Sequence, residues 1–160
     1  MSRRRNTLPS SEECNCFAVR AAARHVTQSY DQFLAPTGLR TTQFTILAKL
    51  KRKGPLTINA LAEAMVMDRT TLGRNILPLE RDGLIRVEPA ASDRRAKDLH
   101  LTKAGEKRFL AALKRWSAAQ ARFDTVFGAK RGADLRVLLR AVVASEFAPA
   151  DRGGAVANTR

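Results

Sequence analysis

The sequence predicts a mainly α-helical protein with one small antiparallel β-hairpin. Apolar residues recur at spacings of three and four along most of the chain, which is typical of amphipathic helices. The period changes to two over residues 84–87 and 98–101, which is typical of short strands. Of the 160 residues, 44% are hydrophobic, and only 9 are glycine and 6 are proline, so the chain can form a core.

The first expected helix lies within residues 11–40 and ends near Ala35-Pro36-Thr37-Gly38. Its apolar residues follow one another at steps of three and four, which places them on one stripe of the helix. These residues are Cys16, Val19, Ala23, Val26, Tyr30 and Phe33. We expect residues 1–10 and the tail 149–160 to be disordered.

Three further helices are expected before the hairpin. One runs over residues 41–53, turns Phe44, Leu47, Ala48 and Leu50 inward, and is broken by Gly54-Pro55. A short one follows Thr57, which is a plausible N-cap. The third begins at Asp68, a good N-cap residue, and ends at Asp82-Gly83.

The helix that follows Asp68 has two different faces. At 100° per residue, Leu72, Ile76 and Leu79 lie close together, while Thr70, Arg74 and Arg81 lie on the opposite side. We therefore expect one buried and one polar face. Pro78 should kink this helix or weaken its last turn.

Strands at residues 84–87 and 98–101 bracket the charged turn ASDRRAK. Thr102 can cap a long fifth helix whose apolar seam is Phe109, Leu113, Trp116, Phe123 and Phe127. A break at residues 128–132 precedes a sixth helix that carries Leu135, Leu138, Leu139, Val142, Val143 and Phe147.

The first helix and the last two helices lie outside the central part of the chain. A chain of this length has little further core to cover their apolar faces, so we expect a two-fold dimer. Residues 11–40 and 103–148 are then dimerisation helices.

The formal net charge of +14 favours a polyanionic partner such as nucleic acid. The charge is spread evenly along the chain, so it does not locate a site. No stretch resembles a membrane span or a signal peptide, and we expect a cytoplasmic protein with no membrane contact. The sequence contains no motif for a catalytic site, a metal site or a cofactor, so we expect no enzyme activity.

Residues 41–102 predict a winged helix-turn-helix, in which three helices are followed by a two-stranded hairpin, the wing. A helix of about 13 residues is about 20 Å long and fits a major groove about 12 Å wide. Arg94 or Arg95 at the tip of the wing is suited to a narrow minor groove. Double-stranded DNA is therefore the expected partner.

Four segments together resemble the MarR family of bacterial transcriptional regulators: TTQFTIL, LAEAM, MDRTTLGRNILPLERDGLIRV and SDRRAKDLHLTKAG. The resemblance covers roughly residues 16–147. It implies a homodimeric winged-helix protein, usually a repressor, that binds a pseudo-palindromic operator and is released by a small ligand or an oxidant. The implied DNA-binding residues are Arg69, Thr70, Thr71, Gly73, Arg74 and Asn75 in the helix, with Arg94 and Arg95 in the wing and Asp93 orienting an arginine.

Gly73 departs from the family pattern, because many relatives carry Thr or Ser at this place. A glycine inside a helix costs about 1 kcal/mol relative to alanine. The residue either permits close approach to the DNA or is a tolerated drift, and the sequence alone leaves both interpretations open.

The segment CNCFAVRAAARHVTQSYDQFLAPTGL resembles the organic-hydroperoxide-sensing branch of this family. Cys16 matches its reactive thiol and Tyr30 matches one of its tyrosines. Arg20 stands where that branch has a second tyrosine, one turn from Cys16, where its charge could lower the pKa of the thiol. The alternative is that Cys16 is a small buried hydrophobe.

An aromatic or carboxylate effector is a second hypothesis for the input signal. Arg20 or Arg24 would anchor the carboxylate, and the pocket would lie near the dimer interface. Phe17, Phe44, Trp116 and Phe123 would line it, or would be plain core. For the whole protein, the alternative function is a non-specific architectural protein that binds DNA or RNA, which would show a steep salt dependence without sequence discrimination.

Overall fold

The computed structural model describes residues 13–90 and 96–147. Both stretches expected to be disordered, 1–10 and 149–160, lie outside these residues. Contacts divide the chain into two units, Met1–Gln120 and Ala121–Arg160, and the boundary falls inside one long helix. Within the described residues, no helix is both long enough and apolar enough to cross a membrane.

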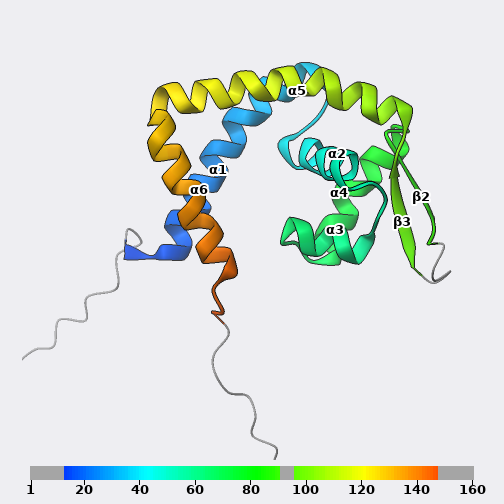
Figure 1. Ribbon diagram of the computed structural model, residues 1–160, viewed down its shortest axis with the longest axis horizontal. Helices are drawn as coiled ribbons and strands as arrows, with labels where there is room; N and C mark the ends of the chain where they lie inside the picture. Colours follow the sequence, from blue (N-terminus) through cyan, green and yellow to red (C-terminus); the bar gives the residue numbers. More distant parts are fainter. Residues whose placement is uncertain (1–12, 91–95, 148–160) are drawn as a thin grey trace, which may run out of the picture. The chain divides into compact units, whose positions relative to one another are not determined.

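The first unit contains most of the secondary structure (Figure 1). In chain order its elements are α1 (Asn15–Leu34), the 3-10 turn η2 (Ala35–Thr37), α2 (Thr41–Lys53), β1 (Leu56–Thr57), α3 (Ile58–Met65), α4 (Arg69–Arg81), β2 (Ile85–Pro89), β3 (Lys97–Leu101) and α5 (Lys103–Phe123), which continues into the second unit.

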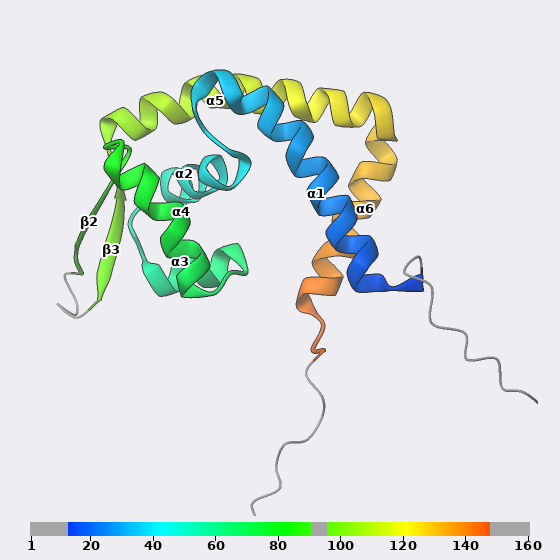
Figure 2. The same cartoon turned by 180° about the vertical axis from the view of Figure 1, so that it is seen from behind.

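Helices α2, α3 and α4 have the expected positions. The Thr57 hydroxyl accepts a hydrogen bond of 3.1 Å from the backbone N–H of Ala60, so Thr57 caps α3 as predicted. Both α3 and α4 contact α2 and each other, and the view from behind shows the same arrangement (Figure 2). The three helices therefore form one helical layer beside the hairpin.

The sheet has three strands rather than the expected two. Its order is β1-β3-β2, and all pairs are antiparallel. Strand β1 places Leu56 opposite Leu99, and its two residues are too few to show an alternating pattern in the sequence. The expected hairpin strands are confirmed, since Ile85 and Leu99 are buried on the inner face.

The core of the first unit joins the helices to the sheet. Phe44 stacks on Phe109 with ring centroids 5.3 Å apart and on Trp116 with centroids 5.9 Å apart. Phe44 and Phe109 are buried, and Trp116 packs against the same cluster. Of the residues expected to line an effector pocket, Phe44 and Trp116 therefore serve as core.

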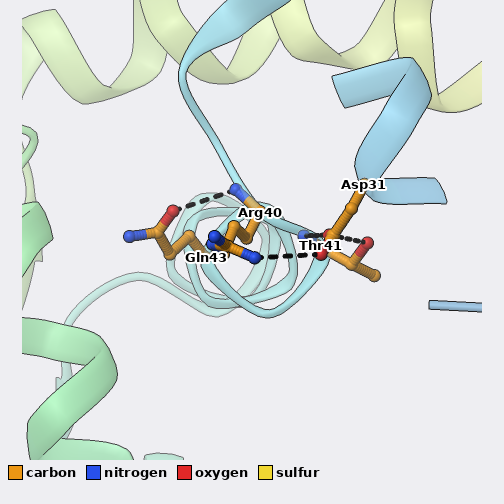
Figure 3. A network of polar contacts seen from close by, with 4 residues as sticks. All are labelled: Asp31, Arg40, Thr41 and Gln43. Carbon is orange, nitrogen blue, oxygen red and sulfur yellow. Dashed lines mark hydrogen bonds and ion pairs between the residues drawn. The ribbon is translucent and has the colours of Figure 1, made fainter. Parts of the chain in front are cut away.

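Helix α1 is joined to the start of α2 by Asp31 (Figure 3). One carboxylate oxygen of Asp31 accepts hydrogen bonds of 2.7 Å from both the backbone N–H and the hydroxyl of Thr41. The other oxygen lies 3.6 Å from the guanidinium of Arg40. An anion at a helix N-terminus is stabilised by the helix dipole, so this contact fixes the entry of α2.

The apolar stripe of α1 is buried only near its C-terminal end. Tyr30 is buried and Phe33 is partly buried, whereas Cys16, Val19 and Ala23 are exposed. Helix α1 contacts η2 and α2, which follow its last turn. Its first half thus presents apolar side chains to the solvent in the single chain.

In the second unit, the expected break at residues 128–132 is shorter and falls at Gly128, whose φ of 97° and ψ of 127° are not helical. A π-helical turn, η3 (Asp124–Gly128), follows α5 directly, and α6 (Ala129–Ala144) begins at the next residue. Gly132, expected in the break, lies inside α6 and is buried, and a Cβ there would be 3.1 Å from the Phe123 ring. Phe147 lies beyond the end of α6.

Candidate nucleic-acid interface

The N-terminus of α4 is held by Asp68. The backbone N–H of Thr71 donates to one carboxylate oxygen at 2.8 Å, and the Thr71 hydroxyl donates to the other at 2.6 Å. These hydrogen bonds lower the pKa of Asp68 below its ordinary value of 3.8. The bond from the Thr71 hydroxyl has the largest effect, and the bond from the Thr71 backbone N–H has the next largest. The carboxylate stays ionised and keeps the first turn of α4 formed.

The predicted contact residues of α4 divide into two groups. Thr71 and Asn75 are engaged within the helix, since the Asn75 side-chain amide donates to the Thr71 carbonyl oxygen at 2.8 Å. Arg69, Thr70 and Arg74 are exposed and extend from the first two turns. These three are the side chains best placed to reach a partner.

The inward face of α4 is as predicted. Leu72, Ile76 and Leu79 are all buried in the core cluster of the first unit. Pro78 lies inside the helix and has no N–H, so the carbonyl of Arg74 lacks its usual helical donor. The helix nevertheless continues to Arg81.

One residue on the outward face was missed by the sequence reasoning. Leu77 is 64% exposed. The signal that could have found it is its helical angle, since seven residues at 100° place Leu77 about 20° from Thr70. The face that carries Thr70 and Arg74 is therefore not wholly polar.

Gly73 lies on the same side of α4, and the structure bears on its two interpretations. A Cβ atom built on Gly73 would meet nothing within 4 Å other than its chain neighbours and the backbone of α4 itself. The protein itself therefore does not require a glycine here. What the missing side chain leaves is open space on the outer surface of the helix.

The wing projects from the sheet as a two-stranded ladder. Ala90 N–H donates to the Ala96 carbonyl at 2.9 Å, the last described pair before the tip. The predicted tip residues Asp93, Arg94 and Arg95 lie outside the described residues. On the strands, the Glu88 carboxylate lies 3.2 Å from Arg86 Nε and 3.4 Å from His100 Nε2.

The base of the wing is fixed to the start of α5 by Thr102. Its hydroxyl donates to the carbonyls of Gly83 at 2.7 Å and Leu84 at 3.1 Å, and accepts from the Gly105 N–H at 3.0 Å. This confirms Thr102 as the cap of α5. It also explains why a threonine and a glycine follow the wing, because both residues join α5 to the segment between α4 and β2.

The proposed sensor residues do not gather within one chain. Cys16 and Arg20 are exposed, whereas Tyr30 is buried and its phenol bonds to Gln120. Fourteen residues of helix separate Cys16 from Tyr30 by about 21 Å along the axis. Cys14 precedes the helix as its N-cap, and its sulfur accepts from Phe17 N–H at 3.4 Å. The interpretation of Cys16 as a buried hydrophobe is wrong for the single chain.

The other residues considered for effector binding are similarly dispersed. Phe17 and Arg24 are exposed on α1, and Phe123 belongs to the second unit. Within the described parts of the chain, no group of three or more His, Cys, Asp or Glu side chains could hold a metal ion.

Comparison with known proteins agrees with this arrangement. The model of the MarR family matches residues 39–97, from two residues before α2 to the first residue of β3. The helix-turn-helix transcriptional regulator YwoH of Bacillus subtilis (strain 168) is 29% identical over 91 residues, which are 57% of this chain and 66% of YwoH, just under two thirds of that protein.

Solved structures match over a longer stretch. The transcriptional regulator MosR of M. tuberculosis is 35% identical, with a TM-score of 0.72 over 85% of this chain and 100% of that chain. MosR in complex with DNA is 37% identical, with a TM-score of 0.71 over 82% of this chain and 98% of that one. The PcaV regulator from Streptomyces coelicolor, with its natural ligand, shares the fold at 19% identity and a TM-score of 0.76, covering 86% and 97%.

The polar-faced helix, the wing and the match to MosR over that protein's whole length agree with one another. This chain belongs to the MarR family of winged-helix, DNA-binding transcriptional regulators.

Proposed function

We propose that the protein is a homodimeric repressor that binds a pseudo-palindromic operator and is released by a small ligand or an oxidant. The observation that carries this proposal is the two-faced helix α4. Its core face is fully buried, and its Asp68-capped first turns present Arg69, Thr70 and Arg74 outward. A helix N-terminus that presents such side chains can read base edges in a major groove.

The wing would contact the neighbouring minor groove or the DNA backbone. Residues Arg94 and Arg95 are proposed as its contacts, with Asp93 orienting one of them. The ladder up to Ala90 and Ala96 and the Thr102 contacts support this proposal, because they hold the strands in a fixed relation to α4 within the same unit.

Dimerisation is proposed to use the exposed apolar faces of α1 and α6. On α6 the exposed apolar residues are Val137, Leu138, Leu139, Val142 and Val143, and on α1 they include Phe17 and Val19. A monomer rarely leaves so many large apolar side chains on one helix in water. Two-fold symmetry would present two copies of α4 about 34 Å apart, one helical turn of DNA.

Two inputs are proposed for release from the operator. An oxidant would act at Cys16, whose thiol is exposed and lies one helical turn before Arg20. The distance along α1 means that Tyr30 could assist this thiol only from a second copy. A small aromatic or carboxylate effector is the other input, and PcaV, a protein of the same fold, was solved with its natural ligand.

The proposal is tested by selecting binding sites from a pool of random-sequence duplex DNA. The affinity for the selected sites is then measured at physiological salt. We expect one enriched pseudo-palindrome, bound by a dimer at least about 10³-fold more tightly than random DNA. A steep salt dependence without enrichment would instead support a non-specific architectural protein. Repeating the measurement with cumene hydroperoxide, for the native chain and for Cys16→Ser, tests the oxidant input.

A further inference from the structure

An apolar position lies on the outward face of α4, next to two arginines and one glutamate. Leu77 is 64% exposed, and its helical neighbours at three and four residues are Gly73, Arg74, Glu80 and Arg81. An isolated exposed leucine is common on protein surfaces. Leu77, however, lies two turns after Thr70 on the face of α4 that points away from the core. A DNA groove that receives α4 would therefore contact Leu77.

The surface beside Leu77 is open. Apart from its chain neighbours and the helix backbone, a Cβ on Gly73 would have no contact within 4 Å, so the position beside it is open in the single chain. Side chains of a helix lean toward its N-terminus, which directs Leu77 toward Gly73. Thr70 borders the same space one turn earlier and carries a methyl group. We name this space between Thr70 and Leu77, above Gly73, the Gly73 notch.

The notch is matched by one group of the major groove. Base edges there present hydrogen-bond donors and acceptors, and the single apolar group is the 5-methyl of thymine. A methyl placed in the Gly73 notch would contact Leu77 and the methyl of Thr70. Arg74 lies about 60° from Leu77 around the helix axis. Its guanidinium therefore remains available for a neighbouring base or phosphate.

We propose that α4 recognises a thymine in each half-site by receiving its 5-methyl group in the Gly73 notch, with Leu77 as a specificity-determining residue. This inference rests on the proposed function, because it requires α4 to enter the major groove. Burial of one methyl group is worth about fourfold in affinity.

The test uses the DNA sequence enriched from the random pool. Each thymine is replaced in turn, symmetrically in both half-sites, by deoxyuridine, which removes only the methyl group. Affinity is measured for the native chain, for Leu77→Ala, and for Leu110→Ala as a control. Leu110 is another exposed leucine and lies on α5.

We expect one symmetric pair of replacements to weaken the native chain about 16-fold, fourfold per half-site. Leu77→Ala should bind the thymine and uracil forms equally, while Leu110→Ala should keep the native discrimination. Circular dichroism should show Leu77→Ala to be folded, since the side chain is mostly outside the core.

Two results would overturn the inference while leaving the proposed function intact. One is an enriched site at which no deoxyuridine replacement weakens binding. The other is a Leu77→Ala chain whose affinity falls by the same factor for the thymine and uracil forms, so that the native preference for thymine is kept. Leu77 would then be a contact to the DNA backbone. Failure to enrich any sequence would overturn the proposed function, and this inference with it.

Discussion

A Cβ atom on Gly105 would lie 1.9 Å from the carbonyl oxygen of Leu84 and 2.8 Å from Leu101 Cδ1. No alanine fits there without displacement of backbone. Gly105→Ala should therefore lower the free energy of unfolding by about 2–3 kcal/mol. Urea denaturation of the native and variant chains measures this loss, and an unchanged midpoint would mean that α5 does not pack this closely on the base of the wing.

Gly73→Ala is the matched substitution at a helical glycine with open surroundings. Alanine should raise the free energy of unfolding by about 1 kcal/mol, because helix propensity improves and nothing clashes. The added methyl partly fills the Gly73 notch, so binding of the enriched operator should weaken even as stability rises. If Gly73→Ala instead increases both stability and affinity for the operator, the glycine has no role in DNA binding and is a tolerated drift from the family pattern.

Asp68 should make the stability of α4 depend on pH. Its pKa is lower in the folded chain, so its charge contributes stability that is fully present above the ordinary value of 3.8 and is lost as the pH falls through the lower folded value. Asp68→Asn keeps an oxygen acceptor for Thr71 but cannot ionise. The native chain should exceed this variant in stability at pH 6, and the difference should shrink toward pH 3.

Chemical denaturation of both chains across this pH range measures the difference. A gap that stays constant with pH would show that the Asp68 contribution is the hydrogen bond alone and not its charge. Other acidic groups titrate in both chains equally, so they cancel in the comparison.

The sequence was most informative where local chemistry decides the structure. Helix α2 has the expected bounds because Gly54-Pro55 ends it, and Asp68 and Thr102 cap the helices that they were expected to cap. Strand β1 was missed because two residues carry no period. The break expected at residues 128–132 is confined to Gly128, whose φ of 97° and ψ of 127° are not helical, and Gly132 instead lies buried inside α6.

Within the candidate interface, the sequence identified the outward arginines but not the two kinds of polar residue in α4. Thr71 and Asn75 belong to the same predicted set of contact residues as Thr70, yet their side chains bond to Asp68 and to the helix backbone. Such local bonds depend on rotamers, which a spacing pattern does not specify. The exposed Leu77 was not predicted, because the spacing pattern of α4 identifies the buried stripe of Leu72, Ile76 and Leu79 and not a leucine outside it.

Val66, between α3 and α4, adopts a left-handed backbone conformation with φ of 53° and is 71% exposed. A β-branched residue is strained there by about 1–2 kcal/mol, and the exposed side chain contributes little packing in return. Val66→Gly should raise the free energy of unfolding by about 1 kcal/mol, measured by urea denaturation. A destabilised variant would show that the Val66 side chain packs more than its exposure suggests.

Arg74→Ala separates the two ways in which α4 can hold DNA. Arg74 is exposed on the outward face, so its loss should leave the fold intact. If its guanidinium reads a base, affinity for the enriched operator should fall by about 1–3 kcal/mol and the preference at one position should relax. If it neutralises a phosphate, affinity should fall uniformly over all sequences and the salt dependence should become shallower.

We expect the base-reading result, because Arg74 lies in the second turn of α4 beside Thr70 and the Gly73 notch. Arg24→Ala is the control, since it removes one exposed positive charge from α1. Binding curves on operator and random DNA at several salt concentrations distinguish the outcomes. Equal losses for Arg74→Ala and Arg24→Ala would show that net charge alone governs binding, and that α4 has no special part in it.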